Sequence, residues 1–188
     1  LSVSGWQFQA LKAAYVAGAG NDGLAEAIRK SIVFCRRTAY KDGKFGYSKP
    51  GTGGNMTGVG AVALQLLGEG RCRETKTALE TIAAQRLPLY EAVVESPDKW
   101  DAVAGKSMYG WYYDTQAMYN ARLKPDGSKD RAACKRWAAW RRNFERALVR
   151  HQQPEGYWQV KKGHGMGEDL PGRVLATCWA TLQLEVYY

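Results

Sequence analysis

The chain has 188 residues, with 27 Lys and Arg against 18 Asp and Glu, and a formal net charge of +9. This length suits a substantial core, so we expect residues 1–188 to form one domain. No apolar run approaches the roughly 18 residues of a membrane-spanning helix, and no nucleic-acid motif accompanies the charge. We therefore expect neither a transmembrane segment nor a nucleic-acid partner. Because the first residue is Leu1 rather than Met, we expect the chain to be a piece of a longer protein.

Apolar residues at helical spacing, separated by turns rich in Gly or Pro, predict about seven helices. Their predicted ranges are about 3–17, 24–40, 56–67, 73–84, 109–121, 129–152 and 174–188. Between the fourth and fifth helices, residues 86–106 contain two prolines and are expected to be irregular. The odd-numbered helices are apolar and aromatic, whereas the even-numbered ones are amphipathic and charged. This alternation predicts an all-α fold with an inner layer of apolar helices covered by an outer layer of charged helices.

A short phrase of small and aromatic residues recurs four times, at residues 4–11, 57–64, 111–118 and 177–184. Each copy ends on Leu or Met, and these closing residues are separated by 53, 54 and 66 positions. A long and nearly regular period is typical of repeat architectures, in which each helical hairpin buries its apolar face against the next. The four copies therefore predict four inner helices.

A second element recurs in the loops that lead from an outer helix to an inner one. Gln152, Gly156 and Trp158 match the pattern Q-x-x-x-G-x-W, and Gly43–Phe45 is a weaker copy. This element resembles the repeat of squalene cyclases and protein prenyltransferases. The phrases at residues 2–7, 111–118 and 184–188 are similar to those of bacterial proteins with prenyltransferase/squalene-oxidase repeats. The resemblance implies an α/α-toroid, and about seven helices imply a partial ring.

The catalytic signatures of that superfamily are absent from this sequence. Protonation of an alkene requires clustered acids such as D-x-D-D, and no Asp here has such neighbours. The zinc site of the prenyltransferases requires Asp, Cys and His, yet no D-x-C is present and the chain holds only two histidines. The thioester of complement-type toroids requires a Cys followed by Gly, which is also missing. We therefore expect no metal site and no cofactor.

Basic residues gather in two segments, 29–41 and 129–150. They form either the solvated faces of outer helices or a footprint for an anionic partner such as a polysaccharide or a lipid surface.

Asp114 is the most distinctive candidate because it lies among aromatic residues on a predicted inner helix. A carboxyl group in such surroundings serves as an acid or a ligand anchor, or it simply pairs with a neighbouring helix. Other polar and aromatic residues of the inner helices are candidates for lining a cavity, with ordinary core packing as the alternative. The full candidate set is Trp6, Gln7, Trp111, Tyr112, Tyr113, Asp114, Gln116, Trp179 and Glu185.

Three functions stay open at this level. The first is a ligand- or protein-binding scaffold similar to the terpenoid cyclase and prenyltransferase toroids, of unestablished activity. The second is a degenerate or novel cyclase-like enzyme that uses Asp114 as its acid, and the third is a toroid that acts on or binds acidic polysaccharide. As partners we expect a second copy or flanking repeats of the same protein, and a hydrophobic or anionic ligand. The resemblance to bacterial proteins leaves envelope-associated and secreted locations open, and the sequence does not fix the compartment.

Overall fold

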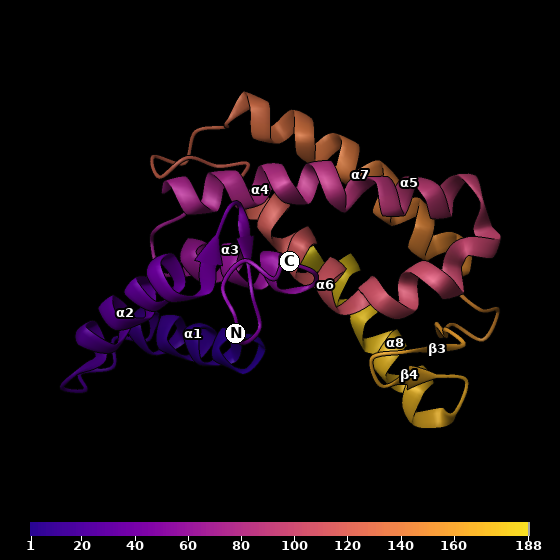
Figure 1. Ribbon diagram of the computed structural model, residues 1–188, viewed down its shortest axis with the longest axis horizontal. Helices are drawn as coiled ribbons and strands as arrows, with labels where there is room; N and C mark the ends of the chain where they lie inside the picture. The colour runs from indigo at the N-terminus through magenta and orange to yellow at the C-terminus, as the bar shows by residue number, and fades with distance from the viewer. Residues whose placement is uncertain (188) are drawn as a thin grey trace. The chain divides into compact units, whose positions relative to one another are not determined.

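The computed structural model describes residues 1–187 and is built almost entirely of helices (Figure 1). The all-α prediction is confirmed. The α-helices are α1 (Ser2–Val16), α2 (Leu24–Val33), α3 (Met56–Leu66), α4 (Arg73–Gln85), α5 (Leu87–Glu95), α6 (Trp100–Asn120), α7 (Arg131–His151) and α8 (Leu170–Leu184). Short π- or 3₁₀-helical turns are η1 (Phe34–Ala39), η2 (Pro97–Lys99) and η3 (Glu185–Tyr187). The two small antiparallel hairpins pair β1 (Tyr40–Lys41) with β2 (Lys44–Phe45), and β3 (Lys162–Gly163) with β4 (Met166–Gly167).

The chain divides into two compact units, Leu1–Ile82 and Ala83–Tyr188, which we call unit 1 and unit 2. The boundary falls within the last turn of α4. Unit 1 contains α1 to α3 and most of α4, whereas unit 2 contains α5 to α8. The expectation of one domain stays a prediction.

In unit 1, α1 packs against both α2 and α3. The approach of α1 to α3 is close, because a Cβ atom placed on Gly5 would lie 2.8 Å from Cγ1 of Val59. Residues 56–64 of α3 are all buried, as expected for a helix that is apolar on every side. Phe45 of β2 covers this helix at Gly60, where a Cβ atom would lie 2.1 Å from the ring. Glycine is therefore required at Gly60 by the packing of the aromatic ring.

In unit 2, α6 contacts α5, α7 and α8, and α5 also packs against α7. The start of α7 is fixed by Asp130, whose side chain accepts a hydrogen bond from the backbone N–H of Ala133 at 2.9 Å. Asp169 caps α8 in the same way by accepting from Gly172 at 3.2 Å. Such caps satisfy N–H groups that the first turn of a helix leaves unpaired.

Several predicted boundaries were wrong. Residues 86–106 are not irregular, because they form α5, η2 and the first turns of α6. Pro88 lies in the first turn of α5, where the missing N–H costs no helical hydrogen bond. The last helix begins at Leu170 rather than near Val174, and the second helix changes to π-helical geometry from Phe34.

The four recurring phrases lie on α1, α3, α6 and α8, which form the contacting pairs α1–α3 and α6–α8. In unit 1 a close approach joins the second position of one phrase, Gly5, to the third position of the next, Val59. In unit 2 the same two positions hold Tyr112 and Trp179, whose ring centroids are 5.4 Å apart. Both helix pairs therefore contain a contact between the same two phrase positions, and Trp179 also lies 5.2 Å from the ring of Tyr109, which precedes its phrase.

Candidate binding site

Asp114 is fully buried on α6 and forms an ion pair with Arg86, the residue that precedes α5. Nε of Arg86 donates to Oδ2 of Asp114 at 3.0 Å, and the exposed fractions of the two side chains are 14% and 0%. A guanidinium in contact stabilises the ionised carboxylate over the protonated acid. The arrangement therefore ties α5 to α6 and does not favour Asp114 as the acid that protonates an alkene.

A buried hydrogen-bonded network surrounds this ion pair and links all four helices of unit 2. The hydroxyl group of Tyr90 on α5 donates to Oε1 of Gln183 on α8, and both side chains are inaccessible to solvent. Nε1 of Trp140 on α7 donates to Oγ1 of Thr115 on α6 at 3.0 Å. Burial also raises the pKa of Tyr90 well above its usual value, so this phenol stays a neutral donor. Each of these hydrogen bonds thus joins two helices of unit 2.

The predicted cavity-lining aromatic residues of unit 2 pack in two groups of rings. The ring of Tyr90 stacks on Trp111 at 3.9 Å, and Tyr112 lies against both Tyr113 and Trp179. Trp111, Tyr112 and Tyr113 are at most 5% exposed. These three residues are packed between α6 and its neighbours. Their role in lining a cavity stays a prediction.

The remaining candidates differ in burial, and two of them lie beside Tyr112. Burial, and then the nearby Glu185, raise the pKa of Tyr112, and Gln116 forms a hydrogen bond with its hydroxyl group. Gln116 on α6 is half-buried, whereas Glu185 is exposed in η3. Trp6 and Gln7 belong to unit 1 and are exposed on α1, where Trp6 has 48% of its surface accessible. A role for these residues in lining a cavity, and a contact of the exposed α1 face with a second copy or a flanking repeat, stay predictions.

The loop that carries the Q-x-x-x-G-x-W pattern forms a tight closure at the end of α7. The side-chain amide of Gln152 donates to the carbonyl of Gly156 at 2.9 Å, and Gly156 has a left-handed φ of 90°. The indole N–H of Trp158 reaches back to the carbonyl of Leu148 at 2.8 Å. The backbone N–H of Trp158 donates to Oγ1 of Thr177, the first residue of the fourth phrase, at 3.1 Å. The motif therefore fastens the end of α7 to α8.

Unit 1 contains a pocket that the sequence did not reveal. Its volume is about 330 Å³, which lies within the usual range of small-ligand sites. It lies where the last turns of α1 and α3 meet the start of α2, and it is lined by Lys12, Tyr15, Ala25, Ile28, Leu66, Leu67 and Gly68. The pocket was missed because its lining comes from three helices whose ends meet only in the folded chain.

Lys12 is the only charged residue among those that line this pocket. Its ammonium group lies 5.8 Å from the centroid of the Tyr15 ring and forms no ion pair within residues 1–187. The other lining residues are apolar apart from the Tyr15 hydroxyl and the backbone. The pocket can therefore hold an apolar chain, with a cation available for an anionic end.

Metal-ligating side chains do not gather within residues 1–187, where no group of three or more His, Cys, Asp or Glu could hold an ion. Within the same residues, no helix combines the length and the apolar character needed to cross a bilayer. No family model, curated protein or solved structure that was compared with the chain matches it. The resemblance to squalene cyclase-like repeats therefore rests on the phrases and loops of this sequence and stays a prediction.

Proposed function

We propose that the chain is a binding domain without catalytic activity, related to the squalene cyclase-like α/α-toroid proteins, and that unit 1 binds a small amphipathic anion. The relationship is supported by one contact in each of the pairs α1–α3 and α6–α8, because both contacts join the same two phrase positions. The loops that follow η1 and α7 also support this relationship. Each of them places a buried aromatic residue, Phe45 or Trp158, beside the following apolar helix.

The pocket of unit 1 is the observation that carries the ligand-binding proposal. Its lining is apolar except at Lys12 and Tyr15, which lie one turn apart on α1. Apolar walls favour a hydrocarbon chain, since its burial releases about 25 cal/mol per Å² of apolar surface removed from water. The ammonium group of Lys12 selects for a carboxylate or phosphate at one end of that chain. Together they define an amphipathic anion as the ligand class.

We propose that the chain lacks catalytic activity because of the surroundings of Asp114. The cyclase alternative requires a strong, protonated acid that faces the substrate. Asp114 instead has a side chain that solvent cannot reach, and its carboxylate is paired with Arg86. This is the geometry of a structural ion pair, so the enzyme alternative has no residue to carry it.

A fluorescent polyene fatty acid, cis-parinaric acid, and its uncharged methyl ester test the ligand class. We expect saturable binding of both probes, with the acid bound more tightly. Lys12→Met should weaken binding of the acid by about tenfold and leave the ester unchanged, because only the acid loses a charge-assisted contact. Ala25→Trp, at an exposed lining position, should fill the pocket and abolish binding of both.

Lys30→Met on the same hairpin is the matched control, because Lys30 is exposed and does not line the pocket. It should bind both probes like the unmodified chain. Failure of both probes to bind, or binding that survives Ala25→Trp, would contradict the proposed site. Turnover of an isoprenoid substrate by the purified chain would contradict the absence of catalysis.

A further inference from the structure

The exposed face of α7 carries a straight row of four basic residues. Arg131, Lys135, Arg142 and Arg146 are separated by intervals of four, seven and four residues and are all exposed. At about 100° per residue, these intervals place all four within about 60° of one another around the helix, over a length of about 22 Å. The opposite face is buried and includes Trp137, Trp140, Phe144 and Leu148. The row is therefore the outward face of a helix that is anchored by its apolar side.

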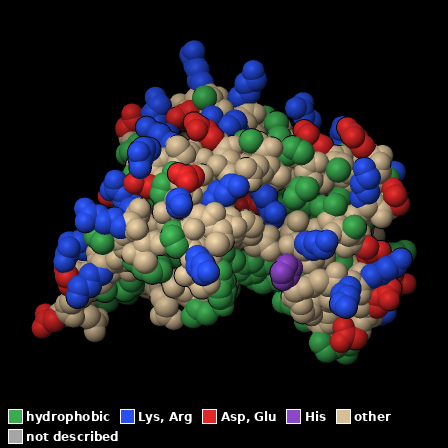
Figure 2. Space-filling model, in the orientation of Figure 1, with side chains coloured by type: hydrophobic (Ala, Val, Ile, Leu, Met, Phe, Trp, Pro, Cys, Tyr) green, Lys and Arg blue, Asp and Glu red, His purple; other side chains and the backbone are tan. Residues whose placement is uncertain are grey.

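The four cations of this row are not neutralised by neighbouring carboxylates. Glu145 is the only acidic residue of α7, and it pairs with Arg141 at 3.0 Å. Glu145 also accepts a hydrogen bond from the hydroxyl group of Tyr187. None of the four residues in the row forms an ion pair within residues 1–187. Figure 2 shows Lys and Arg side chains projecting at the top of the view, where α7 lies in Figure 1.

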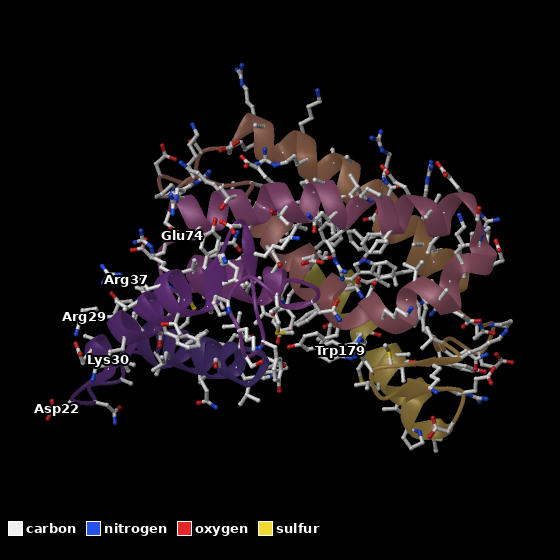
Figure 3. The ribbon with its side chains drawn as sticks, viewed as in Figure 1. Asp22, Arg29, Lys30, Arg37, Glu74 and Trp179 are labelled. Atoms are coloured by element: carbon white, nitrogen blue, oxygen red, sulfur yellow. The ribbon has the colours of Figure 1, made fainter. Side chains whose placement is uncertain are left out.

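The basic residues of α2 and η1 provide a contrast within the same chain. Arg29 and Lys30 both form ion pairs with Glu26, and Arg36 pairs with Glu69 and Glu74. Arg29, Lys30 and Arg37 point outward in Figure 3, and all three are exposed. Exposure is thus common to both segments, whereas an uncompensated row is specific to α7.

The composition of the α7 face selects among anionic partners. Single-stranded nucleic acids are bound by exposed aromatic rings on which bases stack, and sugars are commonly bound in the same way. Trp137, Trp140 and Phe144 of α7 are buried. The apolar residues on the exposed face are Ala138, within the row, and Val149, which follows the row and is 65% exposed. Such a face offers positive charge and a small apolar contact without any element that reads bases or sugars. A flat array of anionic headgroups matches it best, because arginine pairs with phosphate through two parallel hydrogen bonds.

We propose that the row Arg131, Lys135, Arg142 and Arg146 adsorbs the chain onto bilayer surfaces that contain anionic phospholipid. Adsorption is electrostatic and reversible, and α7 lies along the surface without entering the hydrocarbon. Each basic residue near an anionic surface strengthens partitioning by about fivefold, so four of them together give a partition coefficient several hundredfold above that of a neutral face. Salt weakens the attraction because it screens the charges.

Cosedimentation with vesicles tests this proposal directly. Vesicles of phosphatidylcholine with about 30% phosphatidylserine should retain the chain, and pure phosphatidylcholine vesicles should not. The fourfold variant Arg131→Gln, Lys135→Gln, Arg142→Gln and Arg146→Gln should lose at least about a hundredfold in partitioning. Raising the salt from about 0.1 M to about 0.5 M should release the unmodified chain.

A charge-matched variant separates the row from net charge. Arg29→Gln, Lys30→Gln, Arg37→Gln and Lys41→Gln removes the same four charges from exposed positions in unit 1 and should reduce partitioning by less than about tenfold. Circular dichroism melting checks that both variants fold. An equal loss in both would show that only net charge matters and would overturn the proposal. The proposal would also be overturned if the fourfold α7 variant lost its binding to a single-stranded oligonucleotide or an acidic polysaccharide but kept its binding to the vesicles. That polymer would then be the favoured partner.

Discussion

The helix pairs α1–α3 and α6–α8 use the same two positions of a repeated phrase and fill them with opposite kinds of side chain. In unit 1 the contact joins Gly5 to Val59, and a single added carbon would lie 2.8 Å from its neighbour. In unit 2 it joins Tyr112 to Trp179, two aromatic rings with centroids 5.4 Å apart. The same two phrase positions therefore accommodate both a close backbone approach and a contact between aromatic rings.

The two units also differ in the polar contacts that their cores contain. Unit 2 encloses an ion pair and side-chain hydrogen bonds that join its helices. Unit 1 surrounds α3 mainly with apolar side chains, although it also buries Glu74 and Thr75 on α4, and it keeps an open pocket where helix ends meet. Buried polar contacts are costly to leave unpaired, so they make unit 2 specific and intolerant of change. The pocket gives unit 1 space for a ligand.

The largest expected effect is that of breaking the ion pair of unit 2. Asp114→Asn should lower the free energy of unfolding by about 3–5 kcal/mol, because Arg86 keeps its charge in a largely buried position without a carboxylate. Urea denaturation measures the loss, and hydrogen exchange should localise it to α5 and α6. Glu145→Gln removes the carboxylate of a largely exposed pair and should cost less than about 1 kcal/mol. Similar losses for the two variants would mean that Asp114 is not the central polar contact of unit 2.

The packing of unit 1 is tested at Gly60. Gly60→Ala should destabilise the chain by about 1–3 kcal/mol, because the new methyl group would overlap the Phe45 ring beside α3. Thermal melting followed by circular dichroism is the measurement. Gly20→Ala is the matched control, since a Cβ atom there meets nothing within 4 Å and the residue lacks a positive φ. A neutral Gly60→Ala variant would show that the close packing of β2 on α3 is not required.

A difference in alkaline sensitivity sharpens the comparison further. Burial raises the pKa of the Cys35 thiol in unit 1 from 9.0 to about 12, so the unfolded chain releases this proton at lower pH than the folded chain. The contribution of the thiol is therefore fully present below pH 9 and is lost as the pH rises towards 12. By pH 10.5 the loss should reach about 2 kcal/mol.

Urea denaturation at pH 8.5 and 10.5 measures this loss, and the difference between the unmodified chain and Cys35→Ala isolates the thiol from other groups. Tyr90 in unit 2 acts with the same sign, but only above its ordinary pKa of 10.0, because burial raises that pKa as well. An identical pH dependence in Cys35→Ala and the unmodified chain would contradict the role of the buried thiol.

The spacing of apolar residues predicted the helices because it records which residues share a face of a helix. The recurring phrases lie on all four helices of the contacting pairs α1–α3 and α6–α8. It failed at residues 86–106, since Pro88 and Pro97 were interpreted as breaks. Pro88 instead occupies the first turn of α5, where proline is tolerated, and Pro97 begins the short turn η2. A single proline does not distinguish the start of a helix from its interruption.

The sites were harder to predict because their parts come from distant segments. Asp114 stood out by its aromatic neighbours, but its partner Arg86 lies 28 positions away in the stretch expected to be irregular. The pocket of unit 1 depends on helix ends, which sequence patterns locate least well. Trp6 and Gln7 were candidates for lining a cavity because of their helical spacing on a predicted inner helix. Both are exposed on α1, and that role stays a prediction.

The exposure of Trp6 has a spectroscopic consequence. Of the seven tryptophans, Trp6 alone belongs to unit 1, and it is 48% exposed. The other six lie in unit 2, where Trp111 and Trp140 are fully buried and should emit at shorter wavelength than a solvated indole. The intrinsic fluorescence of the chain is therefore almost wholly a signal from unit 2. Replacing Trp6 with Phe leaves a protein whose emission follows the unfolding of that unit alone.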